Sequence, residues 1–458
     1  MKKEKLWSLY LFIALIVILF TSMLVLCGMY LNLRLNGITS SLPKIPVNDK
    51  WILTNSASDS HGKAGELISP VFMGVKNDAS GMYAAVYDKD ARDYLNKQIE
   101  PKMTALFNGN AEKINLHSDE EKKQFVKNTM LSDDYIFISF YNQLPSSAIL
   151  PGIYGSGSYM PLNENFDVKY VFILPEEDTV KGICFDKKLN AVELSPLEKI
   201  AFDKNDYSAY NEINGFASFE FISETYPEPV FTESFDIKSL LMSQSFSFFR
   251  FDLSDARIKQ LLTILDFNTN LVKTYTYNEN DVISFVGEEK ELYVSRSDNM
   301  LYYNGYDAGI HMSEYLNYYP QNDGYTFTDT VLCLKYLLNS IDRILVGGDA
   351  PASIVSVSHV GDDTVFKLKY FYNGIMVTDK PYDISVVIDG EFIKSIEIGV
   401  LFCDSGNLNV PVIPQKLAMN VFDKDEFKEG IASCNAMLTQ NEETGRAELT
   451  WVVRKDAQ

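Results

Sequence analysis

Cysteine is scarce in this sequence, and its positions exclude two structural classes. The chain has 458 residues and five cysteines. No two cysteines form a C-x-x-C pair, and no cysteine and histidine have the spacing of a zinc site. Such a pattern also excludes a small scaffold held together by disulfides, so folded cores must stabilise the chain. A disulfide is left open between any two of four residues: Cys184, Cys333, Cys403 and Cys434.

Sequence motifs for metals, cofactors and catalysis are lacking as well. The acidic clusters do not match a calcium loop, and neither a phosphate loop nor a dinucleotide fingerprint occurs. The nearest approach to a nucleophile elbow is "YGSGSY", Tyr154 to Tyr159, whose residue order and context favour a flexible loop. We therefore predict no catalytic, cofactor-binding or metal-binding residues. The histidines lack ligand spacing and are interpreted as surface or structural residues: His61, His117, His311 and His359.

Basic residues are outnumbered by acidic ones. The chain has 41 Lys and Arg against 62 Asp and Glu, which gives a formal net charge of −21. Because no basic stripe is present to meet phosphates, the composition argues against a nucleic-acid partner. The hydrophobic share of 46 % is enough to bury ordinary cores.

Charge is missing altogether from residues 6–33. The apolar part, Leu6 to Cys27, would be about 33 Å long as a helix, enough for a bilayer core of about 30 Å. It is longer than the apolar region of a cleaved signal peptide and has no small-residue cleavage site, so we predict an uncleaved transmembrane helix. Cys27 is interpreted as a packing residue rather than a lipidation site, because Leu26 before it is large.

Three lysines at the N-terminus predict the orientation of this helix. Lys2, Lys3 and Lys5 should keep the short N-terminus in the cytoplasm. The acidic remainder of the chain then lies outside. The expected location is the cell membrane, with a single pass and extracytoplasmic C-terminal domains.

Hydrophobic periodicity after the linker predicts an α+β fold. Helical patterns are followed by strands joined by short turns, which indicates units of helix plus antiparallel β-meander rather than a parallel sheet. Pro227 and Pro229 are interpreted as marking the first boundary. The predicted regions are 1–35 for the cytoplasmic tip and anchor, 36–50 for the linker, 51–230 for an N-terminal α+β domain, 231–325 for a middle one and 326–458 for a C-terminal one.

Three helix features carry specific predictions. Ser118 is expected to cap a helix, with Glu121 completing a capping box. Thr328 is a candidate N-cap of the helix that follows it. Pro101 should kink or split the helix in which it lies.

The stretch "SFSFFRFDLSD", Ser245 to Asp255, raises the strongest question of catalysis. Acid/base chemistry would need two carboxylates that converge on a substrate with separated pKa values. Asp252 and Asp255 instead lie at the start of a helical pattern. Asp252 or Ser254 is expected to cap this helix, while Asp255 complements its dipole.

Longer segments then suggest a family. A membrane anchor precedes "FFRFDLSDARIKQ", "LVKTYTYNENDVISF", "KELYVSRSDNMLYYNG" and a last helix-plus-meander with "SVVIDGEFIKSIEI". Residues 230–400 resemble the YycH family of Gram-positive bacteria, with kinship to YycI in the last two units. The positions that carry the resemblance are Phe249, Asp252, Tyr275, Tyr277, Tyr303 and Asn304.

The resemblance implies a regulator rather than an enzyme. Proteins of that family restrain a sensor histidine kinase that controls cell-wall metabolism. The implied partners are this kinase, a YycI-like membrane protein and, through residues 6–30, the lipid bilayer. Two other functions stay open: an anchored assembly or wall-binding module with exposed aromatic platforms, and, with less support, an anchored hydrolase.

Overall fold

The computed structural model describes only part of the chain. The described residues are 67–78, 81–86, 89–154, 165–202, 215–243, 252–277, 281–306, 309–316, 325–345, 351–377, 382–412, 414–416, 432–440 and 446–455. All of them belong to the second of two compact units, Lys50–Gln458. The predicted transmembrane helix, the linker, Cys27 and residues 155–159 of "YGSGSY" lie outside these ranges. No helix within them is both long and apolar enough to cross a membrane.

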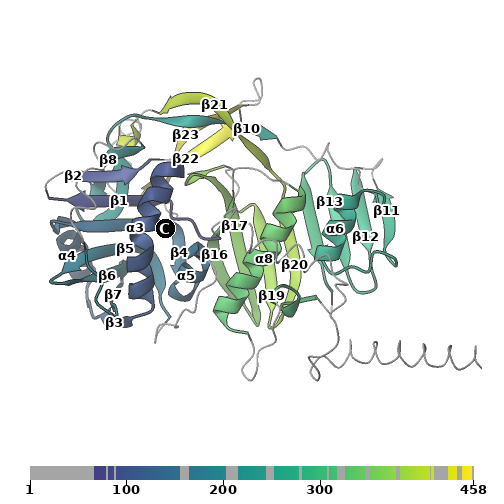
Figure 1. The fold of residues 1–458 in the computed structure, drawn as a ribbon, viewed down its shortest axis with the longest axis horizontal. Helices are drawn as coiled ribbons and strands as arrows, with labels where there is room; N and C mark the ends of the chain where they lie inside the picture. Colours follow the sequence, from purple (N-terminus) through teal and green to yellow (C-terminus); the bar gives the residue numbers. More distant parts are fainter. Residues whose placement is uncertain are drawn as a thin grey trace, which may run out of the picture. The chain divides into compact units, whose positions relative to one another are not determined.

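The first half of the second unit is built on a nine-stranded sheet whose pairings are all antiparallel. The strand order is β3-β7-β6-β5-β4-β1-β2-β8-β9 (Figure 1). The strands are β1 (Phe72–Asn77), β2 (Gly81–Ala85), β3 (Asn110–Ile114), β4 (Tyr135–Pro145), β5 (Asp167–Glu176), β6 (Thr179–Phe185), β7 (Ala191–Ser195), β8 (Phe216–Ser223) and β9 (Tyr226–Phe231).

Three helices accompany this sheet: α3 (Lys89–Phe107), α4 (Asp119–Leu131) and α5 (Ser146–Tyr154). Ser118 caps α4 as predicted, since its Oγ accepts the Glu121 N–H at 3.2 Å. The Glu121 carboxylate reaches back to the His117 N–H at 2.7 Å, one residue earlier than in a standard capping box. The predicted split of α3 is wrong, because the helix continues through Pro101.

The two prolines at the predicted boundary lie inside a strand. Pro227 and Pro229 belong to β9, at one edge of the nine-stranded sheet. An edge strand tolerates proline because a missing N–H on its outer side breaks no ladder bond. The next strand, β10 (Phe235–Ser243), already belongs to the second sheet.

Aromatic packing shows that the first sheet curls over itself. Phe221 lies on β8, three places from β4 in the strand order. Its ring centroid is nevertheless 5.1 Å from that of Phe137 on β4 and 6.2 Å from that of Phe172 on β5. Phe137 and Phe172 are fully buried, so this aromatic cluster is the core of the curled sheet.

The second half contains a 14-stranded sheet. Besides β10, its strands are β11 (Lys273–Tyr277), β12 (Val282–Val286), β13 (Glu291–Ser295), β14 (Met300–Asn304), β15 (Ile310–His311), β16 (Ala352–Val360), β17 (Asp363–Tyr372), β18 (Ile375–Met376), β19 (Ile384–Asp389), β20 (Phe392–Gly399), β21 (Phe402–Val412), β22 (Ala432–Gln440) and β23 (Arg446–Lys455). Its helices are α6 (Ala256–Ile264), α7 (Ser313–Leu316) and α8 (Phe327–Leu345). The pairings are antiparallel except between β18 and β22, so the chain has the predicted α+β class.

Two helix-plus-meander units form the central part of this sheet. One consists of α6 and β11 to β14, and the other of α8 and β16, β17, β19 and β20. Their last strands, β14 and β20, pair antiparallel, which joins both meanders into one layer. The sequence indicated the repetition of the two units but not their fusion, because strand pairing across 100 residues leaves no local pattern.

Both helices cover the same face of the joined meanders. Phe366, Val386, Ile396 and Tyr303 are consecutive partners across β17, β19, β20 and β14 and therefore point to one side. The ring of Phe327, in α8, stacks on Phe366 with centroids 5.9 Å apart. Phe267, just after α6, lies 6.1 Å from Tyr303. Figure 1 shows α6 and α8 on this common side, so the opposite face of β11 to β14 is the outer one.

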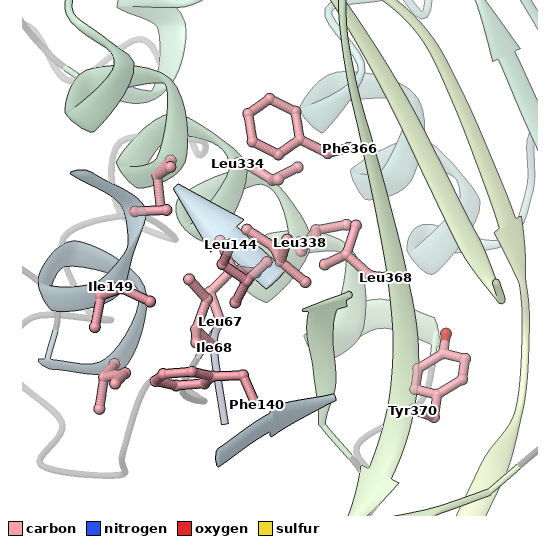
Figure 2. Close-up of a cluster of buried hydrophobic side chains, with 14 of the residues drawn as sticks. Leu67, Ile68, Phe140, Leu144, Ile149, Leu334, Leu338, Phe366, Leu368 and Tyr370 are labelled. Carbon is pink, nitrogen blue, oxygen red and sulfur yellow. The ribbon is translucent and has the colours of Figure 1, made fainter. Parts of the chain in front are cut away.

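The two halves meet in a buried apolar cluster (Figure 2). It combines Leu67, Ile68, Phe140, Leu144 and Ile149 of the first half with Leu334, Leu338, Phe366, Leu368 and Tyr370 of the second. The segment that precedes β1 is tied to β16: Ile354 donates its N–H to the Leu67 carbonyl oxygen, and the Ser69 N–H donates to Ser353 Oγ, both at 2.8 Å. The described halves thus share one continuous core.

Two predicted helix caps require correction. The N-cap of α6 is Asp255, whose carboxylate accepts the Arg257 N–H at 2.9 Å. Asp252 instead accepts the Ser254 N–H at 2.7 Å in the preceding exposed turn. At α8 the capping residue is Thr326, not Thr328, because Thr326 and Asp329 exchange N–H bonds at 2.8 and 3.2 Å. Each error is a shift of one to three residues within a Ser-, Thr- and Asp-rich helix start.

The corrected cap gives a stability prediction. Asp255→Ala should lower the free energy of unfolding by about 1 kcal/mol, because the second N–H of α6 loses its acceptor. Asp252→Ala, in an exposed turn, should cost less. Urea unfolding of both variants measures the difference, and a larger loss for Asp252→Ala would contradict the assignment of the cap.

Two of the four scattered cysteines are free thiols. Cys184 and Cys333 are both buried and unpaired. Burial raises the pKa of each thiol well above its ordinary value, so both stay protonated. Cys403 and Cys434 lie in β21 and β22 with side chains outside the described set.

Candidate functional site

Four exposed tyrosines form the most distinctive surface of the described chain. Tyr275 and Tyr277 lie on β11, Tyr293 on β13 and Tyr302 on β14. They are between 36 % and 52 % exposed. We call this surface the tyrosine face. Large aromatic side chains left in water in this way are common at sites of protein or ligand contact.

Strand register places these rings on one side of the sheet. Tyr275 pairs with Ser284, Ser284 with Tyr293, and Tyr293 with Tyr302. Directly paired residues point to the same face, so the row crosses four strands. The row does not contain Tyr303, which covers the helix side. The tyrosine face is therefore the side of β11 to β14 opposite α6.

The rings of Tyr293 and Tyr302 contact each other. Their centroids are 6.0 Å apart with an interplanar angle of 63°, an edge-to-face arrangement. Tyr302 pairs in turn with Glu397 of β20. Partial burial and the nearby carboxylates of Glu397 and Asp298 raise the pKa of Tyr302, so its phenol is neutral and can donate a hydrogen bond.

A fixed carboxylate lies at the border of the tyrosine face. Glu291, on β13, accepts hydrogen bonds from Ser284 Oγ at 2.5 Å and from the Tyr306 hydroxyl at 2.7 Å. The bond to Glu291 raises the pKa of Tyr306. Because both carboxylate oxygens are occupied, Glu291 has a defined position, and it adds negative charge beside the aromatic rings.

The six positions that carry the family resemblance lie in different parts of the structure. Phe249 lies outside the described residues, and Asp252 lies in the exposed turn before α6. Tyr275 and Tyr277 are both on the tyrosine face. Asn304 is exposed on the same side of β14, where its Oδ1 accepts the Tyr306 N–H at 2.9 Å. Tyr303 is buried on the other side and belongs to the core.

Sequence reasoning missed two members of the tyrosine face. Tyr293 lies between Leu292 and Val294, which are both fully buried. Tyr302 likewise lies next to Leu301 and Tyr303, which face the core. The alternation of apolar and other residues in these short strands was the signal that could have separated surface tyrosines from buried ones.

Tyr303 provides a test of its structural role. Its hydroxyl is buried and has no hydrogen-bond partner among the described residues. Tyr303→Phe should therefore leave the free energy of unfolding unchanged or raise it by up to about 1 kcal/mol, because an unsatisfied polar group is removed. Tyr315 is the matched control, since its hydroxyl donates to the Ile264 carbonyl oxygen at 2.6 Å. Tyr315→Phe should cost about 1–2 kcal/mol.

The same pair of variants has a pH dependence of known sign. Burial raises the pKa of Tyr303 in the folded protein above its ordinary value. The folded state therefore holds this proton more tightly, and stability should fall as pH rises above about 10. Tyr303→Phe should reduce that alkaline loss. Urea unfolding at neutral and alkaline pH measures it, and an equal cost of the two variants at neutral pH would contradict the assignment.

A serine, a histidine and a glutamate also come together at the start of α7. Ser313 Oγ lies 2.8 Å from His311 Nδ1, and His311 Nε2 lies 3.1 Å from Glu391 Oε2. The Ser313 N–H approaches the same Nδ1 at 3.2 Å. A serine nucleophile needs access to its substrate and donors for an oxyanion. Ser313 is only 8 % exposed, and its two bonds to one nitrogen are those of a turn.

We interpret this cluster as a contact that fixes α7 to β20. The register of β15, in which His311 pairs with Phe392, brings Glu391 beside a histidine 80 residues away. No spacing rule could have found that contact. The other potential chemistry is also missing: no group of acidic, histidine and cysteine side chains suited to a metal occurs within the described ranges.

Comparisons with known proteins bear on the fold. A solved structure of YycH from Bacillus subtilis aligns with a TM-score of 0.52 at 13 % identity, and the alignment covers 86 % of this chain and 96 % of that one. An uncharacterized protein from Eubacterium rectale aligns with a TM-score of 0.32 at 12 % identity, over 48 % of this chain and 77 % of that one. No family model and no curated protein matches the sequence. The chain therefore has a YycH-like fold.

Proposed function

We propose that this protein is a membrane-anchored extracytoplasmic regulator of a two-component sensor histidine kinase involved in cell-wall control. The kinase and a YycI-like membrane protein are its proposed partners. The proposed anchor is the apolar segment 6–30, with the N-terminus in the cytoplasm. In this proposal the protein acts by contact and carries out no catalytic step.

The observation that carries the proposal is the extent of the structural likeness. The alignment with YycH includes nearly all of that chain, 96 %, so both halves of the fold take part in it. At 13 % identity this likeness concerns the fold. The functional step comes from the sequence resemblance to the same family, which implies kinase regulation.

Regulation by contact sets a physical requirement. A partner can shift the kinase between two states only if it binds one of them more tightly than the other. Contacts could involve the membrane helix, by van der Waals packing in lipid, and the domains outside. The tyrosine face supports the second contribution, because its exposed aromatic rings suit a protein interface.

Co-purification tests the proposal. The full chain, tagged and cross-linked in intact cells of its source, should retain a membrane histidine kinase. Deleting its gene should change the phosphorylation of the cognate response regulator. A matched variant that carries an unrelated apolar helix in place of residues 6–30 should lose the kinase if helix contact is required. Absence of any kinase, together with unchanged phosphorylation after deletion, would refute the proposal.

A wall-binding module is the second candidate function. The tyrosine face supports it, because aromatic rings also stack on sugars. Binding of purified peptidoglycan by the full chain, abolished by Tyr275→Ala and Tyr293→Ala, would favour this function. Retention of the kinase without peptidoglycan binding would favour the regulator.

A further inference from the structure

The strand β11 has an outer edge that no described strand occupies. β11 is the first strand in the order of the large sheet and pairs only with β12. All five of its residues, Lys273–Tyr277, are exposed, a property shared by no other strand for which the structure describes side-chain burial. The segment contains no proline and no bulge in its register with β12. A regular, exposed edge of this kind is a template for another strand.

The ladder pattern identifies the backbone groups that face outward. Across β12 and β13, Gly287 donates to the Lys290 carbonyl oxygen and Arg296 to that of Asp281. Because hydrogen-bonded pairs alternate in an antiparallel ladder, residues 282, 284 and 286 of β12 bond to β11.

The register then fixes the orientation of β11 itself. The partners of residues 282, 284 and 286 are Tyr277, Tyr275 and Lys273, which direct their N–H and C=O groups to β12. Thr274 and Thr276 therefore direct their backbone groups to the open edge.

The equivalent strand of the second meander shows an occupied edge. β16 follows α8 as β11 follows α6. Like β11, β16 is the first strand of its meander, and it pairs with the second strand, β17. Its Ile354 N–H donates to the carbonyl oxygen of Leu67, in the segment that precedes β1. On the outer face beside it, the ring of Tyr141 from β4 lies 5.9 Å from Phe371 of β17. A chain segment and an aromatic contact from the first half thus cover this end of the sheet.

Charge on the outer side of β11 to β14 favours a basic occupant. The register places Lys273 and Glu291 in one row of this side, and Glu397 of the neighbouring β20 lies opposite Tyr302. Asp298 also lies close enough to Tyr302 to raise its pKa, so three carboxylates accompany the rings. The faces of Tyr275 and Tyr277 lie nearest to the open edge and attract cations. A lysine or arginine on an added strand would extend over these rings.

We propose that β11 receives an extended, lysine- or arginine-bearing segment of a protein partner, which adds a strand to the large sheet beside the tyrosine face. Backbone bonds to Thr274 and Thr276 hold the segment, and its alternate side chains lie over Tyr275 and Tyr277. The inference rests on the proposed function in one respect, namely that the partner is a protein.

Binding of designed strands to the full chain in detergent tests this proposal. The probe is a ten-residue peptide of alternating threonine and lysine, and the control replaces lysine by glutamate. Fluorescence anisotropy should show binding of the lysine peptide alone, and hydrogen exchange should slow at the Thr274 and Thr276 amides. Thr276→Pro should weaken binding about fivefold or more, because one edge N–H is lost.

Matched variants separate backbone from side-chain effects. Thr276→Ala removes the same side chain but keeps the N–H, so it should change binding less than about twofold. A proline is compatible with folding at a position of an edge strand where the N–H of the original residue faces outward, because no bond of the sheet is lost there. Tyr275→Ala leaves the backbone intact and should weaken binding on its own. Equal effects of Thr276→Pro and Thr276→Ala, binding of the glutamate peptide, or binding of a peptidoglycan fragment in place of the peptide would overturn the proposal.

The two failures can be told apart. If the wild-type chain retains the kinase in cells but does not bind the lysine peptide, the strand-addition proposal falls and the regulatory function stands. If the peptide binds at β11 while neither kinase capture nor response-regulator phosphorylation supports regulation, the regulatory function falls and the edge site stands.

Discussion

We expect Phe137→Ala to lower the free energy of unfolding by about 3–5 kcal/mol. Phe137 is fully buried in the curled first sheet. Its ring centroid lies 4.9 Å from that of Phe172 and 5.1 Å from that of Phe221. Truncation removes these contacts and leaves a cavity between β4, β5 and β8, which the rigid sheet cannot fill by collapse.

Chemical unfolding followed by circular dichroism measures this loss. Phe392→Ala is the control, because Phe392 is 37 % exposed in β20. Its cost should not exceed about 1 kcal/mol. A cost below about 1 kcal/mol for Phe137→Ala would show that the aromatic packing between β8 and β4 is not the main core of the first sheet.

The second large effect concerns a buried ion pair that closes the same curl. Lys169 Nζ on β5 lies 2.8 Å from Glu228 Oε1 on β9, and the two side chains are 9 % and 17 % exposed. The Tyr170 hydroxyl donates to the same oxygen at 2.5 Å. Burial, followed by the charge of Glu228, raises the pKa of Tyr170, so this phenol remains a donor.

Glu228→Ala should lower the free energy of unfolding by about 3 kcal/mol. The change removes the carboxylate from a buried ammonium and from a buried hydroxyl at once. Urea unfolding at neutral pH measures the loss. Most of this loss should come from the cost of keeping the Lys169 ammonium out of water without the Glu228 carboxylate, and less from the attraction between the two charges.

Two comparisons test that interpretation. The double variant Lys169→Met with Glu228→Leu removes both charges and should recover to within about 1 kcal/mol of the wild type. Glu224→Ala breaks the Lys127–Glu224 pair, also close at 2.5 Å but with Glu224 79 % exposed, and should have a much smaller effect. Equal losses for Glu228→Ala and Glu224→Ala would contradict a buried role for the first pair.

Local features of the fold were predictable where short-range physics decides them. The Asp-Gly pair in "IDGEF" is typical of a two-residue hairpin turn, and Gly390 has φ +55° between β19 and β20. The Ser118 cap also follows from spacing alone. The cap at Asp255 was missed because Asp252, Ser254 and Asp255 all have side chains that accept backbone N–H groups. The residue types therefore leave a few candidate N-cap positions, and the residue at which the helix begins decides between them.

The candidate site was predictable only in part. Tyr275 and Tyr277 were singled out through a family resemblance, and both are on the tyrosine face. Tyr303 was singled out by the same resemblance but is buried. Neighbouring tyrosines such as Tyr302 and Tyr303 are chemically identical, so the position of each within the alternation of its strand, and not the residue type, separates a surface ring from a core ring.

By itself, the sequence determined the α+β class, the antiparallel meanders and the expectation of an acidic, anchored protein without catalytic motifs. These depend on composition and on patterns within about ten residues. The tertiary structure alone decided the curl that brings Glu228 to Lys169, the pairing of β14 with β20, and the open edge of β11. The first two features join residues about 60 to 100 positions apart, and such contacts are selected by the burial of whole faces rather than by any local preference.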